Sequence, residues 1–117
     1  MNFSMVHHIS INVADAETAK SFYVDSLGFE EIERPDLGFN GAWLQIGDQQ
    51  LHLLEVENHN APAGQHFAFK VEDIHQYRDY LIEKGIKVSD PAELGGVCIQ
   101  CFFKDPSGNL LELNQPC

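Results

Sequence analysis

The chain contains an internal repeat, and this repeat restricts its fold more than any other feature. Residues 8–15 read HISINVAD and residues 66–73 read HFAFKVED. Both segments start with His, place apolar residues at the second, fourth and sixth positions, and end in Asp. Self-similarity of this kind is typical of folds built from copies of one supersecondary unit. The sequence therefore predicts a single domain of two related modules, about 1–58 and 59–117.

A helix-like stretch follows the Asp in each copy. Apolar residues recur at spacings of three and four in residues 15–29 and 73–86, as they do on one face of a helix. Asp15 and Asp73 suit the N-cap position of these helices. Gly28 and Gly85 stand where a helix C-terminus favours a left-handed residue. Each copy is therefore expected to continue from a strand into a helix.

Each copy then continues with a predicted strand hairpin. Residues 41–56 read GAWLQIGDQQLHLLEV, with a turn signal at Gly47-Asp48, and residues 97–114 read VCIQCFFKDPSGNLLELN, with a turn signal at 105–108. Trp43 precedes His52 by nine residues and Phe103 precedes Glu112 by nine, so these positions are taken as equivalent. The expected fold is α+β, with two βαβββ modules.

Period-two alternation sorts the side chains of the first strand of each module into faces. His8, Ser10 and Asn12 share one face, and Ile9, Ile11 and Val13 share the other, which suits a helix. In the matching strand, His66, Ala68 and Lys70 share a face opposite Phe67, Phe69 and Val71. In the last strand of each module, a single polar residue stands between leucines, and these two residues are His52 and Glu112.

A ligand-type residue thus stands on the first and last strand of both modules. A lone strand His is more often a hydrogen-bonded residue than a ligand, and a lone Glu is usually solvated, but repetition at equivalent positions favours a shared purpose. Three imidazoles and one carboxylate suit one divalent Fe, Mn, Ni, Co or Zn ion, which would also compensate a buried carboxylate. The predicted metal ligands are His8, His52, His66 and Glu112. His7 is a weaker candidate because it should point to the opposite, apolar face.

Several other side chains are candidates for a substrate pocket beside these ligands. The candidates are Ser10, Asn12, Trp43, Lys70 and Phe102, with Phe39 as a further wall residue. Lys70 and Arg34 are possible anchors for an anionic substrate, although a lysine at a sheet rim is usually just solvated. We expect the partner to be a small-molecule substrate.

The bulk properties exclude several function classes. The formal net charge of −11 argues against binding to nucleic acid or to an anionic membrane, which needs clustered Lys and Arg. No stretch of 18 apolar residues predicts a membrane span, and the first residues lack the pattern of a signal peptide. Three cysteines, Cys98, Cys101 and Cys117, are an odd number and predict no disulfide framework. The default expectation is a cytoplasmic protein, with Cys98 and Cys101 as ordinary strand residues.

The segments HHISINVAD, FYVDSLGFE, QLHLLEV, QHFAFKVED and FFKDPSGNLLEL resemble the vicinal oxygen chelate superfamily, which includes glyoxalase I, extradiol dioxygenases and bleomycin-resistance proteins. The resemblance covers essentially the whole chain. It implies a U-shaped mixed sheet around one metal held at the four predicted ligand positions. It also implies a homodimer, often with sites shared between subunits. In such a site Glu112 could move a proton as the catalytic residue.

Departures from the family patterns leave the reaction open. Relative to glyoxalase I, His52 stands where a Glu is normal, Asn12 where an Arg is expected, and Val56 where an Asn is expected. Relative to extradiol dioxygenases, Phe103 stands at the position of a Tyr. The favoured function is a metal-dependent lyase, isomerase or dioxygenase that chelates a small oxygen-rich substrate and stabilises an enolate or oxyanion. The alternative is a metal-free sequestration protein of the bleomycin-resistance type.

Overall fold

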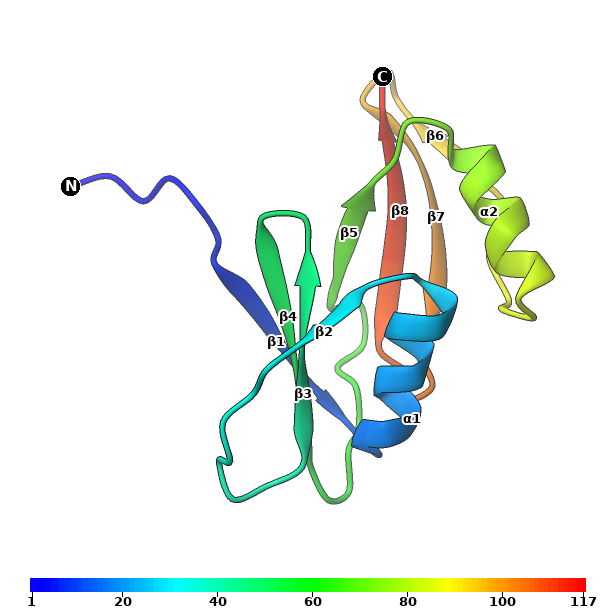
Figure 1. Ribbon diagram of the computed structural model, residues 1–117. Helices are drawn as coiled ribbons and strands as arrows, with labels where there is room; N and C mark the ends of the chain where they lie inside the picture. Colours follow the sequence, from blue (N-terminus) through cyan, green and yellow to red (C-terminus); the bar gives the residue numbers. More distant parts are fainter. The chain divides into compact units, whose positions relative to one another are not determined.

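The computed structural model describes residues 1–117 and comprises two compact units, Met1–His59 and Asn60–Cys117 (Figure 1). The first unit contains β1 (His8–Val13), α1 (Ala16–Ser21), the π-helical turn η1 (Phe22–Ser26), β2 (Glu30–Ile32), β3 (Gly41–Ile46) and β4 (Gln49–Glu55). The second contains β5 (His66–Lys70), α2 (Ile74–Glu83), β6 (Ala92–Leu94), β7 (Cys98–Lys104) and β8 (Leu110–Pro116).

Each unit forms a four-stranded mixed sheet with the same topology. The strand order is β1-β4-β3-β2 in the first unit and β5-β8-β7-β6 in the second. The first and last strands of each unit are parallel neighbours, whereas the other neighbours are antiparallel. The predicted α+β fold of two βαβββ modules is confirmed.

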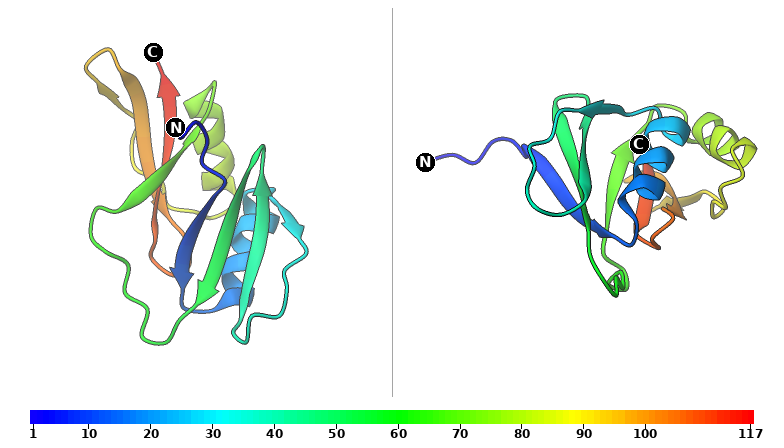
Figure 2. Two further views of the ribbon diagram at one scale, coloured as in Figure 1. Left: turned by 90° about the vertical axis from the view of Figure 1, so that its left-hand side faces the viewer. Right: turned by 60° about the horizontal axis from the view of Figure 1, so that its bottom comes forward.

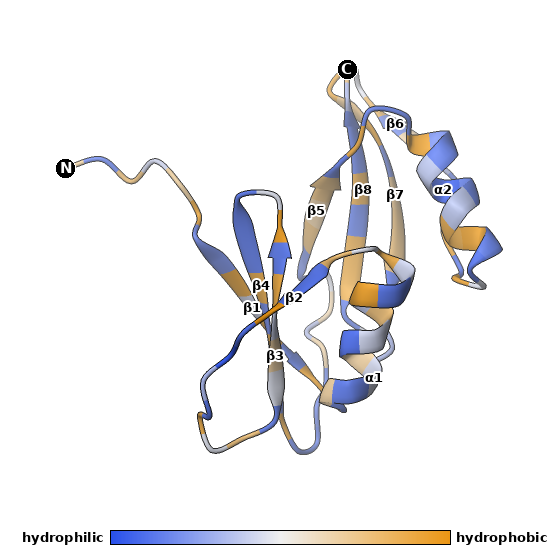
Figure 3. Cartoon of the chain, in the orientation of Figure 1, coloured by the Kyte–Doolittle hydropathy of each residue, from blue (hydrophilic) through white to orange (hydrophobic).

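The helix of each unit covers one face of its own sheet (Figure 2). Helix α1 contacts β3 and β4, and α2 contacts β7 and β8. Hydrophobic and hydrophilic residues alternate along the helices and strands, which leaves one apolar face to bury (Figure 3). The largest fully buried side chains are Tyr23, Leu44, Leu51, Leu53, Ile74, Leu111, Val13 and Cys101. Neither helix combines the length and the apolar character that a membrane crossing requires.

The two helices begin in different ways although the same residue type precedes them. The Asp73 side chain accepts hydrogen bonds from the backbone N–H groups of His75 and Gln76, both at 3.2 Å, as expected of an N-cap. Asp15 occupies the N-cap position but makes no such bond, and its carboxylate accepts instead from the Thr18 hydroxyl at 2.7 Å.

The first backbone N–H of each helix donates to a side chain of the sheet. The Ala16 N–H donates to Glu55 Oε2, and the Ile74 N–H donates to Gln115 Oε1, both at 2.9 Å. Glu55 follows His52 by three residues, and Gln115 follows Glu112 by three. Each of these strands therefore carries a predicted ligand on one face and fixes the start of the helix with another side chain.

The two hairpins differ in loop length, and this changes one predicted equivalence. Between β3 and β4 the chain turns over Gly47-Asp48, whereas between β7 and β8 it uses residues 105–109. As a result Trp43 lies opposite His52, but Phe102 lies opposite Glu112. The expectation that Phe103 corresponds to Trp43 is wrong, since Phe103 points into the core and is 3% exposed.

Candidate metal centre

The first pair of predicted ligands lies in the first unit, on the neighbouring strands β1 and β4. In their parallel register Ser10 faces His52, and His8 is two residues before Ser10. The rings of His8 and His52 stack, with centroids 4.1 Å apart and planes 14° from parallel. Trp43 on β3 stacks on His52 in turn, at 4.3 Å and 6°. Because β4 runs between β1 and β3, His52 is the middle ring of a three-ring stack.

His52 is buried and is held in the neutral state. It is 8% exposed, and its Nε2 lies 2.9 Å from the Gln50 side-chain oxygen, which can accept the Nε2 hydrogen. Burial lowers the pKa of His52, and the neighbouring His8, His7 and Arg34 lower this pKa further. A neutral imidazole keeps one unprotonated nitrogen, which is the form that binds metals.

His7 lies close to His8 rather than on the opposite face. The two Nδ1 atoms are 2.9 Å apart, and the rings meet edge to face at 5.2 Å. His7 precedes the first residue of β1, so strand alternation does not fix its direction. The prediction that His7 points to the apolar face is therefore wrong.

The second pair lies in the second unit, on β5 and β8. Nε2 of His66 is 3.0 Å from Oε1 of Glu112, and Nδ1 of His66 is 2.8 Å from the Gly64 carbonyl oxygen. A carbonyl oxygen only accepts, so Nδ1 carries a hydrogen, and Nε2 is the nitrogen that faces the carboxylate. The edge of the His66 ring contacts Phe102, with centroids 5.4 Å apart.

Glu112 is buried, and each of its carboxylate oxygens has a partner. Its residue is 5% exposed, Oε1 meets His66, and Oε2 accepts a hydrogen bond of 2.7 Å from the Asn114 side-chain amide. Such partners make the burial of a carboxylate tolerable. Asn114 was not predicted as a site residue, although its position two residues after Glu112 on the same face could have indicated it.

The pairs occupy equivalent places in the two units. Ala68 faces Glu112 in the β5–β8 register, as Ser10 faces His52 in the β1–β4 register. In both units the candidate ligand on the first strand, His8 or His66, stands two residues before this facing residue. The repeat deduced from the sequence therefore extends to the positions of the candidate ligands.

The donor atoms fit a transition metal, although a complete set is not assembled in the structure. Nowhere does the chain gather three or more His, Cys, Asp or Glu side chains around one point. Two ligands about 2.1 Å from one metal and at right angles are about 3.0 Å apart, which matches the 3.0 Å between His66 Nε2 and Glu112 Oε1. A metal ion could therefore be held between these two atoms.

The other predicted pocket residues lie on the same faces as the ligands. Ser10, Asn12 and Lys70 are exposed on the ligand faces of β1 and β5, whereas Trp43 and Phe102 contact the His52 and His66 rings directly. Cys98 and Cys101 are buried free thiols in β7, and burial raises the pKa of Cys101. A buried thiol of this kind is inert, as expected for ordinary strand cysteines.

Curated proteins similar to this chain include an epimerase and a dioxygenase. An ethylmalonyl-CoA/methylmalonyl-CoA epimerase from Cereibacter sphaeroides is 30% identical over 129 residues, which cover 94% of this chain and 96% of that protein. A manganese-dependent 2,3-dihydroxybiphenyl 1,2-dioxygenase from Geobacillus genomosp. 3 is also 30% identical, over 91% of this chain but 35% of that protein.

Solved structures show the same fold over the full length. A glyoxalase family protein from Bacillus anthracis has a TM-score of 0.89 and 27% identity, and covers 100% of this chain and 98% of its own. TnmS3, an antibiotic binding protein from Streptomyces sp. CB03234, has a TM-score of 0.86 and 29% identity, over 100% of this chain and 99% of that one. The family model described as Glyoxalase/Bleomycin resistance protein/Dioxygenase superfamily matches residues 5–113, and the chain therefore belongs to this superfamily.

Proposed function

We propose that the chain is a metal-dependent enzyme acting on a small, oxygen-rich substrate as a lyase, isomerase or dioxygenase. The proposed ligands of one divalent Fe, Mn, Ni, Co or Zn ion are His8, His52, His66 and Glu112. The observation that carries this proposal is the recurrence of a ligand-type pair at the same register positions in both units. Two unrelated pairs of polar residues would have no reason to repeat in this way.

The states of three of these side chains support the ligand role. His52 is neutral because burial lowers its pKa. The Gly64 carbonyl fixes the Nδ1 hydrogen of His66, so that Nε2 is available as a donor atom. Glu112 provides the anionic oxygen, and Asn114 orients it through Oε2. Nitrogen and carboxylate oxygen donors of this kind suit the middle and late first-row divalent metals.

The chemistry follows from this set of residues. When bound, the metal polarises two adjacent oxygens of a substrate and stabilises the negative charge of an enolate or oxyanion. Glu112 is the one carboxylate among these residues, and its Oε1 would accept or return a substrate proton. Asn114 remains bonded to Oε2 and holds the carboxylate while Oε1 exchanges partners.

A sequestration protein is the second candidate function. The stack of Trp43, His52 and His8 offers a flat aromatic surface suited to a planar ligand, and the likeness to an antibiotic binding protein favours the same reading. A metal-free binding protein has no need for a buried Glu112, which is the feature that leads us to prefer the enzyme.

The oligomeric state and the cellular location that we propose follow from the family resemblance and from the free cysteines. We propose a homodimer, as the family resemblance implies, acting on a small molecule. Three free cysteines, two of them buried, are compatible with the reducing conditions of the cytoplasm.

Cobalt titration tests the proposal. Chelator-treated protein is titrated with Co²⁺, the visible absorption spectrum is recorded, and acetohydroxamate is then added as a probe with two adjacent oxygens. We expect saturation at one Co²⁺ per chain and a further spectral change as the probe binds the metal. If no Co²⁺ is taken up, the enzyme proposal fails and the sequestration function becomes the better account.

A further inference from the structure

Arg34 is a cation without an anionic partner in the first unit. This unit has one other Lys or Arg, Lys20, which pairs with Glu17 at 3.2 Å and Glu31 at 3.6 Å. Arg34 takes part in none of the ion pairs of the chain. In a chain with a formal net charge of −11, an arginine that no carboxylate neutralises is unusual.

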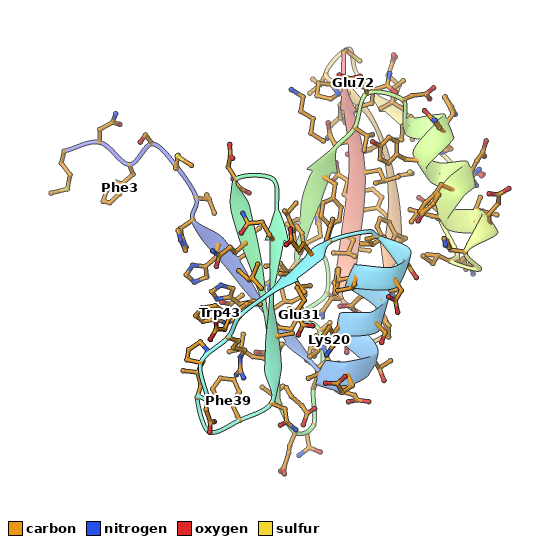
Figure 4. All side chains as sticks on the ribbon, viewed as in Figure 1. Phe3, Lys20, Glu31, Phe39, Trp43 and Glu72 are labelled. Atoms are coloured by element: carbon orange, nitrogen blue, oxygen red, sulfur yellow. The ribbon has the colours of Figure 1, made fainter.

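The guanidinium group of Arg34 is nevertheless held in place. Its Nη2 donates a hydrogen bond of 3.0 Å to the Phe39 carbonyl oxygen, and its Cζ lies 4.9 Å from the centroid of the Phe39 ring. Its Nε is buried and has no hydrogen-bond partner. Figure 4 shows Phe39 in the loop that joins β2 to β3, with Trp43 on the strand that follows. An ordered arginine with unused N–H donors is a prepared anion-binding group.

Gly41 creates the space that this group occupies. A Cβ atom on Gly41 would lie 2.9 Å from Arg34 Nη2 and 3.0 Å from Arg34 Cζ. Gly41 and Trp43 are two residues apart on β3 and therefore share a face. The guanidinium thus lies on the same face of the sheet as Trp43, which stacks on His52.

Arg34 lines an open groove of about 460 Å³, which begins where the pairing of β2 with β3 ends at Ile32 and Trp43. The groove gives a ligand access to the guanidinium.

The surroundings favour a carboxylate over a phosphate. Glu31 and Glu33 line the same groove, and Lys20, which pairs with Glu31 at 3.6 Å, is the only other Lys or Arg of this unit. Such a site suits a monoanion, whereas a phosphate dianion would need further cations. The planar fork of an arginine matches the two oxygens of a carboxylate.

We infer that Arg34 is a specificity-determining residue that binds a carboxylate group of the substrate, while two other substrate oxygens chelate the metal. This inference rests on the proposed function and names the class of substrate: a small chelating molecule that also carries a carboxylate.

Two hydroxamates provide matched probes for this site. Acetohydroxamate and succinate monohydroxamate have the same chelating group, but the second also carries a carboxylate. Their dissociation constants are measured on the Co²⁺-loaded full chain by the change in the visible spectrum. We expect the wild type to bind succinate monohydroxamate about tenfold more tightly than acetohydroxamate, the typical effect of one charge-assisted hydrogen-bonded pair.

Three variants test whether Arg34 causes the preference for succinate monohydroxamate. Arg34→Gln should abolish the preference, Arg34→Lys should keep part of it, and Lys87→Gln, which removes the same charge from an exposed position in the other unit, should retain it fully. Thermal unfolding and Co²⁺ stoichiometry check that each variant folds and still binds metal. A preference unchanged in Arg34→Gln, or absent from the wild type, would overturn the inference while leaving the proposed function intact.

Two further results, competition by phosphate and a lack of Co²⁺ uptake, would each contradict the inference in a distinguishable way. Inorganic phosphate should not compete with succinate monohydroxamate at equal concentration. If phosphate competes in the wild type and not in Arg34→Gln, the site is a phosphate site and the carboxylate inference is wrong. If the wild type takes up no Co²⁺, the proposed function fails, and the inference fails with it.

Discussion

His66 Nε2 and Glu112 Oε1 lie 3.0 Å apart although 46 residues separate them in the sequence. The parallel pairing of β5 with β8 creates this contact, because it places Ala68 opposite Glu112, and His66 stands two residues before Ala68 on the same face of β5. The buried carboxylate is thereby given a partner that can share either a proton or a metal with it. The same register in the first unit joins His8 to His52.

Asn114 should be a positioning residue for Glu112. Asn114→Ala removes the 2.7 Å hydrogen bond to Oε2 and leaves a buried carboxylate oxygen without its donor. We expect metal affinity to fall by about tenfold or more, as is typical when a group that orients a ligand is lost. Competition with a coloured chelator measures this affinity. Lys87→Ala, which alters an exposed residue that belongs to neither sheet, is the control and should leave affinity unchanged.

Gln115 should stabilise the start of α2. Gln115→Ala removes the acceptor for the Ile74 N–H, and we expect a loss of about 1 kcal/mol in the free energy of unfolding, the usual effect of losing a helix cap. Gln115→Glu should retain most of the stability, since Glu55 makes the equivalent bond to Ala16 in the first unit. Urea unfolding monitored by circular dichroism measures both variants. Equal stability of Gln115→Ala and the wild type would show that this bond contributes nothing.

Metal-free protein should lose stability in mild acid because of His52. The pKa of His52 in the folded chain is below its ordinary value of 6.5, so the unfolded chain binds more protons in the interval between the two. The free energy of unfolding should therefore fall as the pH drops below about 6.5, by at most about 1.4 kcal/mol per pH unit from this residue. Urea unfolding at pH 7.5 and pH 5.5 measures the change.

A variant assigns this pH dependence to His52. His52→Gln should reduce the loss of stability between pH 7.5 and pH 5.5, whereas His75→Gln, which alters an exposed residue of α2, should not. An identical pH dependence in His52→Gln and the wild type would contradict the assignment.

The three thiols should differ sharply in reactivity. Cys117 is exposed, whereas Cys98 and Cys101 are buried, and burial raises the pKa of Cys101 and so lowers its thiolate fraction. Iodoacetamide at pH 7.5 should therefore modify one cysteine in the folded protein and three after denaturation. Peptide mass spectrometry identifies the modified residue as Cys117 if the prediction holds. Rapid modification of Cys101 in the folded protein would show that its strand is accessible.

The fold could be predicted because the repeat consists of local sequence patterns. Alternation and helical spacing are properties of neighbouring residues, and the Gly residues after each helix have φ values of +80° at Gly28 and +84° at Gly85, as the helix ends require. The same alternation placed His8 and His66 on the exposed faces of their strands. The metal role of the four candidate ligands stays a prediction.

Features that depend on loop geometry could not be predicted in the same way. Asp105 accepts hydrogen bonds from the Ser107 and Asn109 N–H groups and so builds a longer loop than Gly47-Asp48 does, which shifts the register and makes Phe102 the equivalent of Trp43. The contact of His7 with His8 arises before β1 begins, where no strand period applies. A one-residue change of register moves every side chain to the other face, so such details need the structure.

The metal content of the purified protein tests the central claim most directly. Untagged wild type, His66→Ala, Glu112→Gln and the control His75→Ala are purified without chelator and measured by elemental analysis. The account predicts about one equivalent of Fe, Mn, Ni, Co or Zn per chain in the wild type and in His75→Ala, and loss of this metal in folded His66→Ala and Glu112→Gln. Full retention of stoichiometric metal in both His66→Ala and Glu112→Gln, or no metal uptake by the wild type even after metal is added, would contradict it.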